Sequence, residues 1–203
     1  MQIIKRTATF LFCALSTACV VPINEHTADN SVAVAAVAQQ RGKWDNARVA
    51  YAKAVTEPSL NDADPKKQAI MHYEYGRALG VTCFFDMAEA ELNRAYELDK
   101  QSFGPVYLTL VELARLNLDQ KKYAQSVDYF ERAMPELEFV NAVTEDPRAF
   151  ADILDEYASA LGAVGRAAEA QTATQRASDI RTKNPGTQPI TDRTPYGKQC
   201  TKS

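Results

Sequence analysis

Residues 85–98 read FDMAEAELNRAYEL and contain the pattern that decides the fold. In this frame an aromatic or small residue, a small residue, a large residue and Ala follow at intervals of three, four and three positions. Residues three or four apart share one face of a helix, so the small residues admit a neighbouring helix and the large residue fills the space beside it. The frame occurs four times, as Trp44-Ala47-Tyr51-Ala54, Phe85-Ala88-Leu92-Ala95, Tyr123-Ser126-Phe130-Ala133 and, more weakly, Ala167-Ala170-Thr174-Ala177. Such self-similarity indicates a repeat architecture.

Capping and turn signals place each frame on the second helix of a pair. Asp64-Pro65 and Asp146-Pro147 each set an N-cap acid before a Pro at the first helical position. Pro58 and Pro135 are expected to end helices. No segment alternates as a strand would. The predicted helices span about 29–40, 45–57, 65–80, 85–99, 106–119, 122–134, 147–163 and 166–182.

The frame resembles the tetratricopeptide repeat, a helix-turn-helix unit of 34 residues. The resemblance covers about 28–61, 69–102, 107–140 and 151–184. It implies an all-α, right-handed superhelical solenoid of about four repeats over 28–184, followed by an irregular Pro-rich tail over 185–203. The small residues lie 38 to 44 positions apart, so extra residues must loop out between repeats. A generic helical bundle is the alternative, but it does not account for four frames in register.

The N-terminus has the pattern of a secretory signal peptide over 1–18. Lys5 and Arg6 precede an uncharged, largely apolar run, 7–18, that is too short to span a bilayer. Its end resembles a bacterial lipobox, which implies a lipidated, palmitate-bearing Cys19 and a tether over 19–27. By the same resemblance, Val20 favours the outer membrane, with the protein facing the periplasm. Ordinary cleavage after Ala18 would instead give a soluble periplasmic protein.

Charge and cysteine content narrow the class of partner and the compartment. The formal net charge is −3, and loss of the leader makes it more negative, which disfavours nucleic acid as a partner. Cys83 and Cys200 remain for an intramolecular disulfide, which an oxidising compartment favours. Such a bond would pin the tail across the solenoid. The alternative is a buried free Cys83 with Cys200 free in the tail.

Catalytic and metal-binding patterns are absent from the sequence. His26 falls in the tether, and the resemblance implies a packing position for His72 inside a helix. No HExxH, Gly-rich phosphate loop or paired CxxC occurs. We therefore expect a protein that is not an enzyme and uses no cofactor or metal.

The resemblance places a concave groove along the first helix of each repeat. The residues that it assigns to a protein-binding surface are Tyr73, Arg77, Val81, Leu108, Val111, Arg115, Leu118 and Asp155. This surface would be apolar with two arginines in the middle and acidic at its C-terminal end, and it would suit a peptide with apolar anchors and a carboxylate. Alternatively, Glu74, Glu112 and Glu156 share one register position and would pair with the arginines as a ladder between repeats.

Together these features predict a lipid-anchored periplasmic adaptor that binds a protein during assembly of an envelope complex. A pilotin-like factor for a secretin or type IV pilus system is one alternative. A regulator of cell-wall enzymes is another. All three rest on analogy at the level of the fold.

Overall fold

The computed structural model describes residues 26–57, 60, 63–186 and 193–200, and its only regular elements in those ranges are helices. The predicted signal peptide and Cys19 lie outside these ranges. Among the described helices, none combines the length and apolar character needed to cross a membrane. The helices are α1 (His26–Gln40), α2 (Trp44–Thr56), α4 (Pro65–Val81), α5 (Phe85–Ser102), α6 (Val106–Asp119), α7 (Tyr123–Phe139), α8 (Ala142–Glu145), α9 (Pro147–Ala163) and α10 (Ala167–Lys183).

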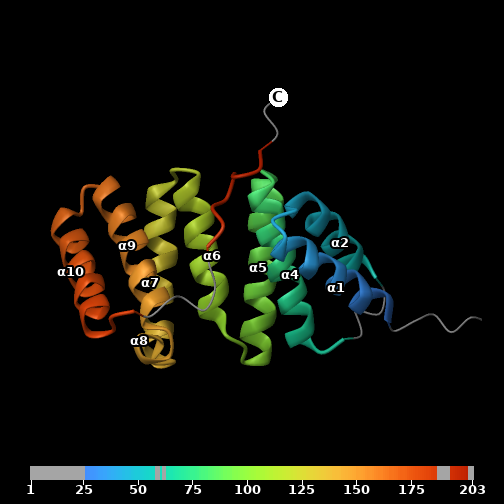
Figure 1. Ribbon diagram of the computed structural model, residues 1–203, viewed down its shortest axis with the longest axis horizontal. Coiled ribbons are helices and arrows are strands. Elements are labelled where there is room, and N and C mark those ends of the chain that lie inside the picture. Colours follow the sequence, from blue (N-terminus) through green and yellow to red (C-terminus); the bar gives the residue numbers. More distant parts are fainter. Residues whose placement is uncertain (1–25, 58–59, 61–62, 187–192, 201–203) are drawn as a thin grey trace, which may run out of the picture.

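The long helices form four pairs, α1–α2, α4–α5, α6–α7 and α9–α10, that stack side by side along the molecule (Figure 1). The frames lie on α2, α5, α7 and α10, the second helix of each pair, as predicted. Close approach is visible where α4 meets α5, because a Cβ added to Gly76 would lie 2.8 Å from Cγ of Leu92. The predicted all-α solenoid is therefore confirmed.

The weak fourth frame has a physical explanation in its position at the end of the stack. Ala173 and Ala177 of α10 are buried against α9, whereas Ala167 and Thr174 are exposed. Among the described residues no further pair covers the outer face of α10, and small and polar residues take the place of the large residue of the frame there.

Pro135 does not end its helix, contrary to the expectation from sequence. It lies inside α7, which continues to Phe139. Proline removes one backbone hydrogen bond from a helix interior. The additional turn, however, buries Leu137 in a cluster with Phe150 and Ile153, and that burial offsets the lost bond.

The turn inside each pair uses one residue in the left-handed region, always two positions before the frame. Gly42 and Gly165 take this conformation with φ of +67° and +83°. Cys83 and Lys121 take it with φ of +74° and +62°, although L side chains disfavour it. The turn geometry is thus constant while the residue varies.

Exchange of the turn residues should change stability in opposite directions. A Cβ at Gly165 meets nothing within 4 Å, so Gly165→Ala incurs only the conformational cost and should lower the unfolding free energy by about 1 kcal/mol. Lys121→Gly should raise the unfolding free energy by about 0.5 kcal/mol. The backbone strain that it relieves at a left-handed position exceeds the additional conformational entropy that glycine loses on folding. Urea unfolding followed by circular dichroism measures both. Equal destabilisation by the two variants would contradict this account of the turns.

Candidate functional site

A hollow of about 850 Å³ opens between the first helices of the second, third and fourth pairs. Helices α4, α6 and α9 supply its walls, and α8 with the end of α7 closes one side. Its lining includes Tyr73, Glu74, Arg77, Tyr107, Leu108, Val111, Glu112, Arg115, Val140, Glu145, Phe150, Asp152, Ile153, Asp155, Glu156 and Arg193.

The structure brings six of the eight predicted groove residues to this hollow. They are Tyr73, Arg77, Leu108, Val111, Arg115 and Asp155. Val81 does not join them, because it is buried in the core cluster that includes Tyr196 of the tail. Leu118 packs instead against a cluster of Val127, Ala160 and Leu161. Both residues lie in the last turn of their helices, which the tail or the next pair covers.

The arginines of the hollow form a ladder of ion pairs with the three register-matched glutamates. Arg77 Nη1 lies 3.1 Å from Glu74, and Arg77 Nε lies 3.8 Å from Glu112. Arg115 continues the row with Nη1 3.0 Å from Glu112 and Nε 2.7 Å from Glu156. Of the two alternatives that the sequence left open, the structure thus contains the ladder. Because it joins α4, α6 and α9, the ladder ties three successive pairs together.

Burial and the neighbouring arginine charges shift the pKa values of the ladder glutamates in opposite directions. Burial raises the pKa of the Glu112 carboxyl, but the charges of Arg115 and Arg77 outweigh burial and hold that pKa below its ordinary value. At Glu156 burial prevails over Arg115 and Arg193, so the pKa of its carboxyl is raised. Glu112 is therefore the firmly ionised member of the row, and Glu156 is the member that accepts a proton more readily.

The described part of the tail, residues 193–200, lies across the same face (Figure 1, red segment). Cys200 forms a disulfide with Cys83 in the turn between α4 and α5, with the two Cα atoms 5.4 Å apart. Arg193 Nη2 donates to Asp119 at 2.6 Å, and Gln199 Nε2 donates to the Gly42 carbonyl at 2.8 Å. The structure therefore contains the predicted pairing of Cys83 with Cys200 and runs the tail across the groove.

The end of the hollow nearest α8 and α9 is apolar with an acidic rim. Tyr107, Leu108 and Phe150 contribute apolar surface, and Leu108 keeps 41% of its surface exposed. Asp152 and Asp155 both pair with Arg181 at 2.6 Å, and Asp152 also lies 3.5 Å from Nε of Arg148. Glu145 adds a third carboxylate to the two cations and two carboxylates there. This half of the hollow consequently combines apolar walls with excess negative charge.

His72 lies in the contact between α4 and α5 and not in the hollow. Arg94 Nε donates to its Nε2 at 3.0 Å, so Nδ1 carries the proton and donates to Glu91 at 2.5 Å. This arrangement agrees with the packing position predicted for it. Within the described residues, no group of three or more His, Cys, Asp or Glu side chains is arranged to hold a metal ion.

Sequence reasoning missed the residues that receive the tail. Asp119 and Gly80 occupy ordinary helical positions, and only their meeting with Arg193 and Tyr196 gives them a role. A glycine in the last turn of an otherwise regular helix, together with a tyrosine in a Pro-rich tail, was the available signal.

Comparison with known proteins identifies the fold. No protein-family model matches the chain, and no curated protein matches it. Among solved structures, BtubC (BKLC) from P. vanneervenii is similar with a TM-score of 0.72 and 19% identity, over 82% of this chain and 68% of that chain. MamA is similar with a TM-score of 0.60 and 15% identity, over 79% of this chain and 81% of that chain.

The TPR-like repeats of a putative kinesin light chain from Podosopora anserina are similar with a TM-score of 0.63 and 17% identity, over 80% of this chain and 79% of that chain. At these identities the likeness concerns the fold alone. The chain therefore has the fold of tetratricopeptide-repeat proteins, as the four frames indicated.

The ladder makes the stability depend on pH through Glu112. Glu112→Gln keeps the shape but leaves Arg77 and Arg115 short of a buried counter-charge, and should lower the unfolding free energy at pH 7 by about 3 kcal/mol. Because the pKa of Glu112 is lowered by folding, its contribution exists above the unfolded pKa and is lost as pH falls through the folded pKa. The difference between wild type and variant should therefore shrink below about pH 4.

Glu156→Gln is the matched control, because folding raises the pKa of Glu156 instead. Its ionised carboxyl costs stability in the folded state, so acidification should stabilise wild type relative to this variant, in the direction opposite to that expected for Glu112→Gln. Guanidinium unfolding at pH 7 and pH 3.5 distinguishes the two. Parallel pH profiles for both variants would contradict the assignment of Glu112 as the ionised centre of the ladder.

Proposed function

We propose that this chain is a non-enzymatic adaptor that binds a segment of a protein partner in the hollow between α4, α6 and α9. The observation that carries this proposal is an open apolar wall on the first helices of three stacked pairs, bounded by charged side chains. Interaction surfaces of this kind use apolar anchors for affinity and polar groups for orientation. Tetratricopeptide-type stacking supports the proposal, since it builds such a surface from successive pairs.

The partner segment that fits best carries an apolar side chain next to a cationic one. Arg77 and Arg115 are engaged with glutamates inside the ladder, so neither presents an uncommitted charge to a ligand carboxylate. Asp152, Asp155 and Glu145 place three carboxylates on the rim, against the two cations Arg148 and Arg181. A Lys or Arg of the partner would complement this excess negative charge. This replaces the acidic ligand that the sequence suggested.

The proposed location is the outer membrane, on its periplasmic side, with a lipid on Cys19 as the anchor. The leader pattern over 1–18 supports export, and the Cys83–Cys200 disulfide supports an oxidising compartment. An anchored scaffold of this kind would hold its partner close to the membrane while an envelope complex assembles. A soluble periplasmic form, cleaved after Ala18, is the alternative location.

Cys19→Ala removes the only lipid acceptor that this proposal names. We expect the variant to leave the membrane pellet and appear in the soluble fraction after osmotic shock, whereas wild type pellets with membranes and is extracted only by detergent. Fractionation with immunoblotting measures this. A variant that remains in the pellet would contradict the lipid anchor without affecting the hollow.

Leu108→Glu tests the hollow, and Val49→Glu is its matched control. Both side chains are exposed, at 41% and 47%, but Val49 lies on α2 away from the hollow. We expect cross-linking and affinity capture from solubilised envelopes to lose the partner with Leu108→Glu, because a carboxylate enters an apolar and already acidic surface. Val49→Glu should retain it, and circular dichroism verifies folding of both. Identical partners captured by both variants would overturn the hollow as the binding surface.

A further inference from the structure

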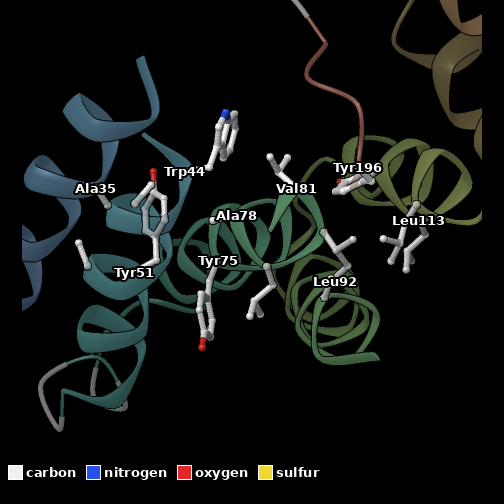
Figure 2. Packing of buried hydrophobic residues seen from close by; sticks show 14 residues of the cluster. Ala35, Trp44, Tyr51, Tyr75, Ala78, Val81, Leu92, Leu113 and Tyr196 are labelled. Atoms are coloured by element: carbon white, nitrogen blue, oxygen red, sulfur yellow. The ribbon is translucent and has the colours of Figure 1, made fainter. Parts of the chain in front are cut away.

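A notch in the middle of the groove holds the ring of Tyr196, which is only 7% exposed although it belongs to an irregular tail. The ring joins a cluster with Val81, Leu113 and Leu116, and Figure 2 shows it between the residues of α4 and α6. Gly80 makes the space, because a Cβ at that position would lie 2.2 Å from Cδ1 of Tyr196. The notch is thus an aromatic slot whose shape depends on the absence of a side chain at Gly80.

The bottom of the slot is polar and matches the tyrosine hydroxyl. Tyr196 Oη donates to Glu112, the ionised centre of the ladder. Burial raises the pKa of this hydroxyl well above its ordinary value, so it stays protonated as a donor. A phenylalanine would fill the same volume but leave Glu112 without this hydrogen bond.

A second subsite receives the arginine three positions earlier. Arg193 Nη2 donates to Asp119 at 2.6 Å, and its Nε lies 3.1 Å from Glu156. The same Asp119 oxygen accepts the Tyr196 backbone N–H at 2.8 Å. One carboxylate of α6 therefore fixes both the arginine and the tyrosine, which sets the spacing between them.

The backbone after the tyrosine is also bound by the end of α4. The Gly197 N–H donates to the Gly80 carbonyl and the Gln199 N–H to the Val81 carbonyl, both at 3.0 Å. The last carbonyls of a helix lack helical partners, so a crossing peptide satisfies them. Gly197 has φ of +77°, which favours glycine at that point of the ligand.

We propose that this notch is a thiol-gated peptide-binding site for an extended Arg-x-x-Tyr-Gly segment. The chain's own tail fills the site while the Cys83–Cys200 bond is closed, and a partner segment of the same chemistry takes its place once the bond is open. This site shares Glu112, Glu156 and Arg193 with the lining of the hollow, but it takes a different segment, and its test does not depend on the proposed function. Glu74, Arg77 and Thr194 border both that hollow and a smaller one of about 410 Å³ near Trp44.

The gating step is a reduction by a dithiol. Its thiolate attacks Sγ of Cys200, which is more exposed than Cys83, and the bond between the two protein sulfurs breaks with Cys83 leaving as the thiolate. The second thiol of the reductant then breaks the mixed disulfide and releases the Cys200 thiol. The reductant becomes a disulfide, and two electrons and two protons reach the protein. While the bond is closed, the tail competes at a high effective concentration with any partner segment.

A labelled peptide of residues 193–200 with Cys200→Ser tests the site in trans by fluorescence anisotropy. The receptors are full-length oxidised wild type, wild type reduced with dithiothreitol, and a Cys200→Ser/Tyr196→Ala chain whose own tail lacks both anchors. We expect at least tenfold tighter binding to the last two than to the oxidised protein. Asp119→Asn or Gly80→Ala in the receptor should reduce binding at least tenfold. Tyr196→Phe in the peptide should reduce binding by a smaller factor.

Two results would overturn the proposal. Absence of peptide binding to the folded Cys200→Ser/Tyr196→Ala chain would make the tail a structural cap and not the occupant of a site. Equal affinity for oxidised and reduced wild type would remove the gate. If circular dichroism shows that the Tyr196→Ala receptor is unfolded, Cys200→Ser/Arg193→Ala replaces it. That receptor keeps the buried Tyr196 ring but holds its own tail less tightly, and its peptide affinity is again compared with that of oxidised wild type. Because the assay uses purified components, its outcome is independent of whether Leu108→Glu loses a partner.

Discussion

The buried carboxylate of Glu112 is the constraint around which the middle of this molecule is arranged. A charge removed from water is tolerated only when counter-charges and hydrogen bonds surround it. Glu112 draws those partners from three separate segments, because Arg77 comes from α4, Arg115 from α6 and Tyr196 from the tail. Each partner fixes the register of its segment against the others. The walls of the groove and the path across it therefore share one electrostatic centre.

The sequence predicted the parts of this arrangement that follow from local periodicity. Four frames with their capping and turn signals located the helix pairs, and the register of Glu74, Glu112 and Glu156 suggested the ladder. Expectations failed where tertiary packing decides: Pro135 stays helical because Leu137 is buried beyond it, and Val81 is covered by the tail. The slot at Gly80 was beyond prediction, since it exists only when residues 116 positions apart meet.

The similar solved structures identify the fold, whereas the side chains of the site determine which partner can bind. Structures with 15% to 19% identity share the stacking of helix pairs, which small and large residues at fixed spacing reproduce with many sequences. They do not transfer the side chains that select a partner. Those must be derived from the excess of carboxylates here, where Glu145, Asp152 and Asp155 face only Arg148 and Arg181, and from apolar surface left uncovered, such as Leu108.

The crossing tail also changes how independently the helix pairs of this repeat protein can move and unfold. In a solenoid each pair contacts only its neighbours, so terminal pairs can open while the centre remains intact. Here one eight-residue segment contacts the Gly42 turn of the first pair, the Cys83 turn of the second, Asp119 of the third and Glu156 of the fourth. The tail therefore links helix pairs that would otherwise contact only their immediate neighbours. Bending, twisting and fraying of the stack are thereby coupled into a single cooperative motion.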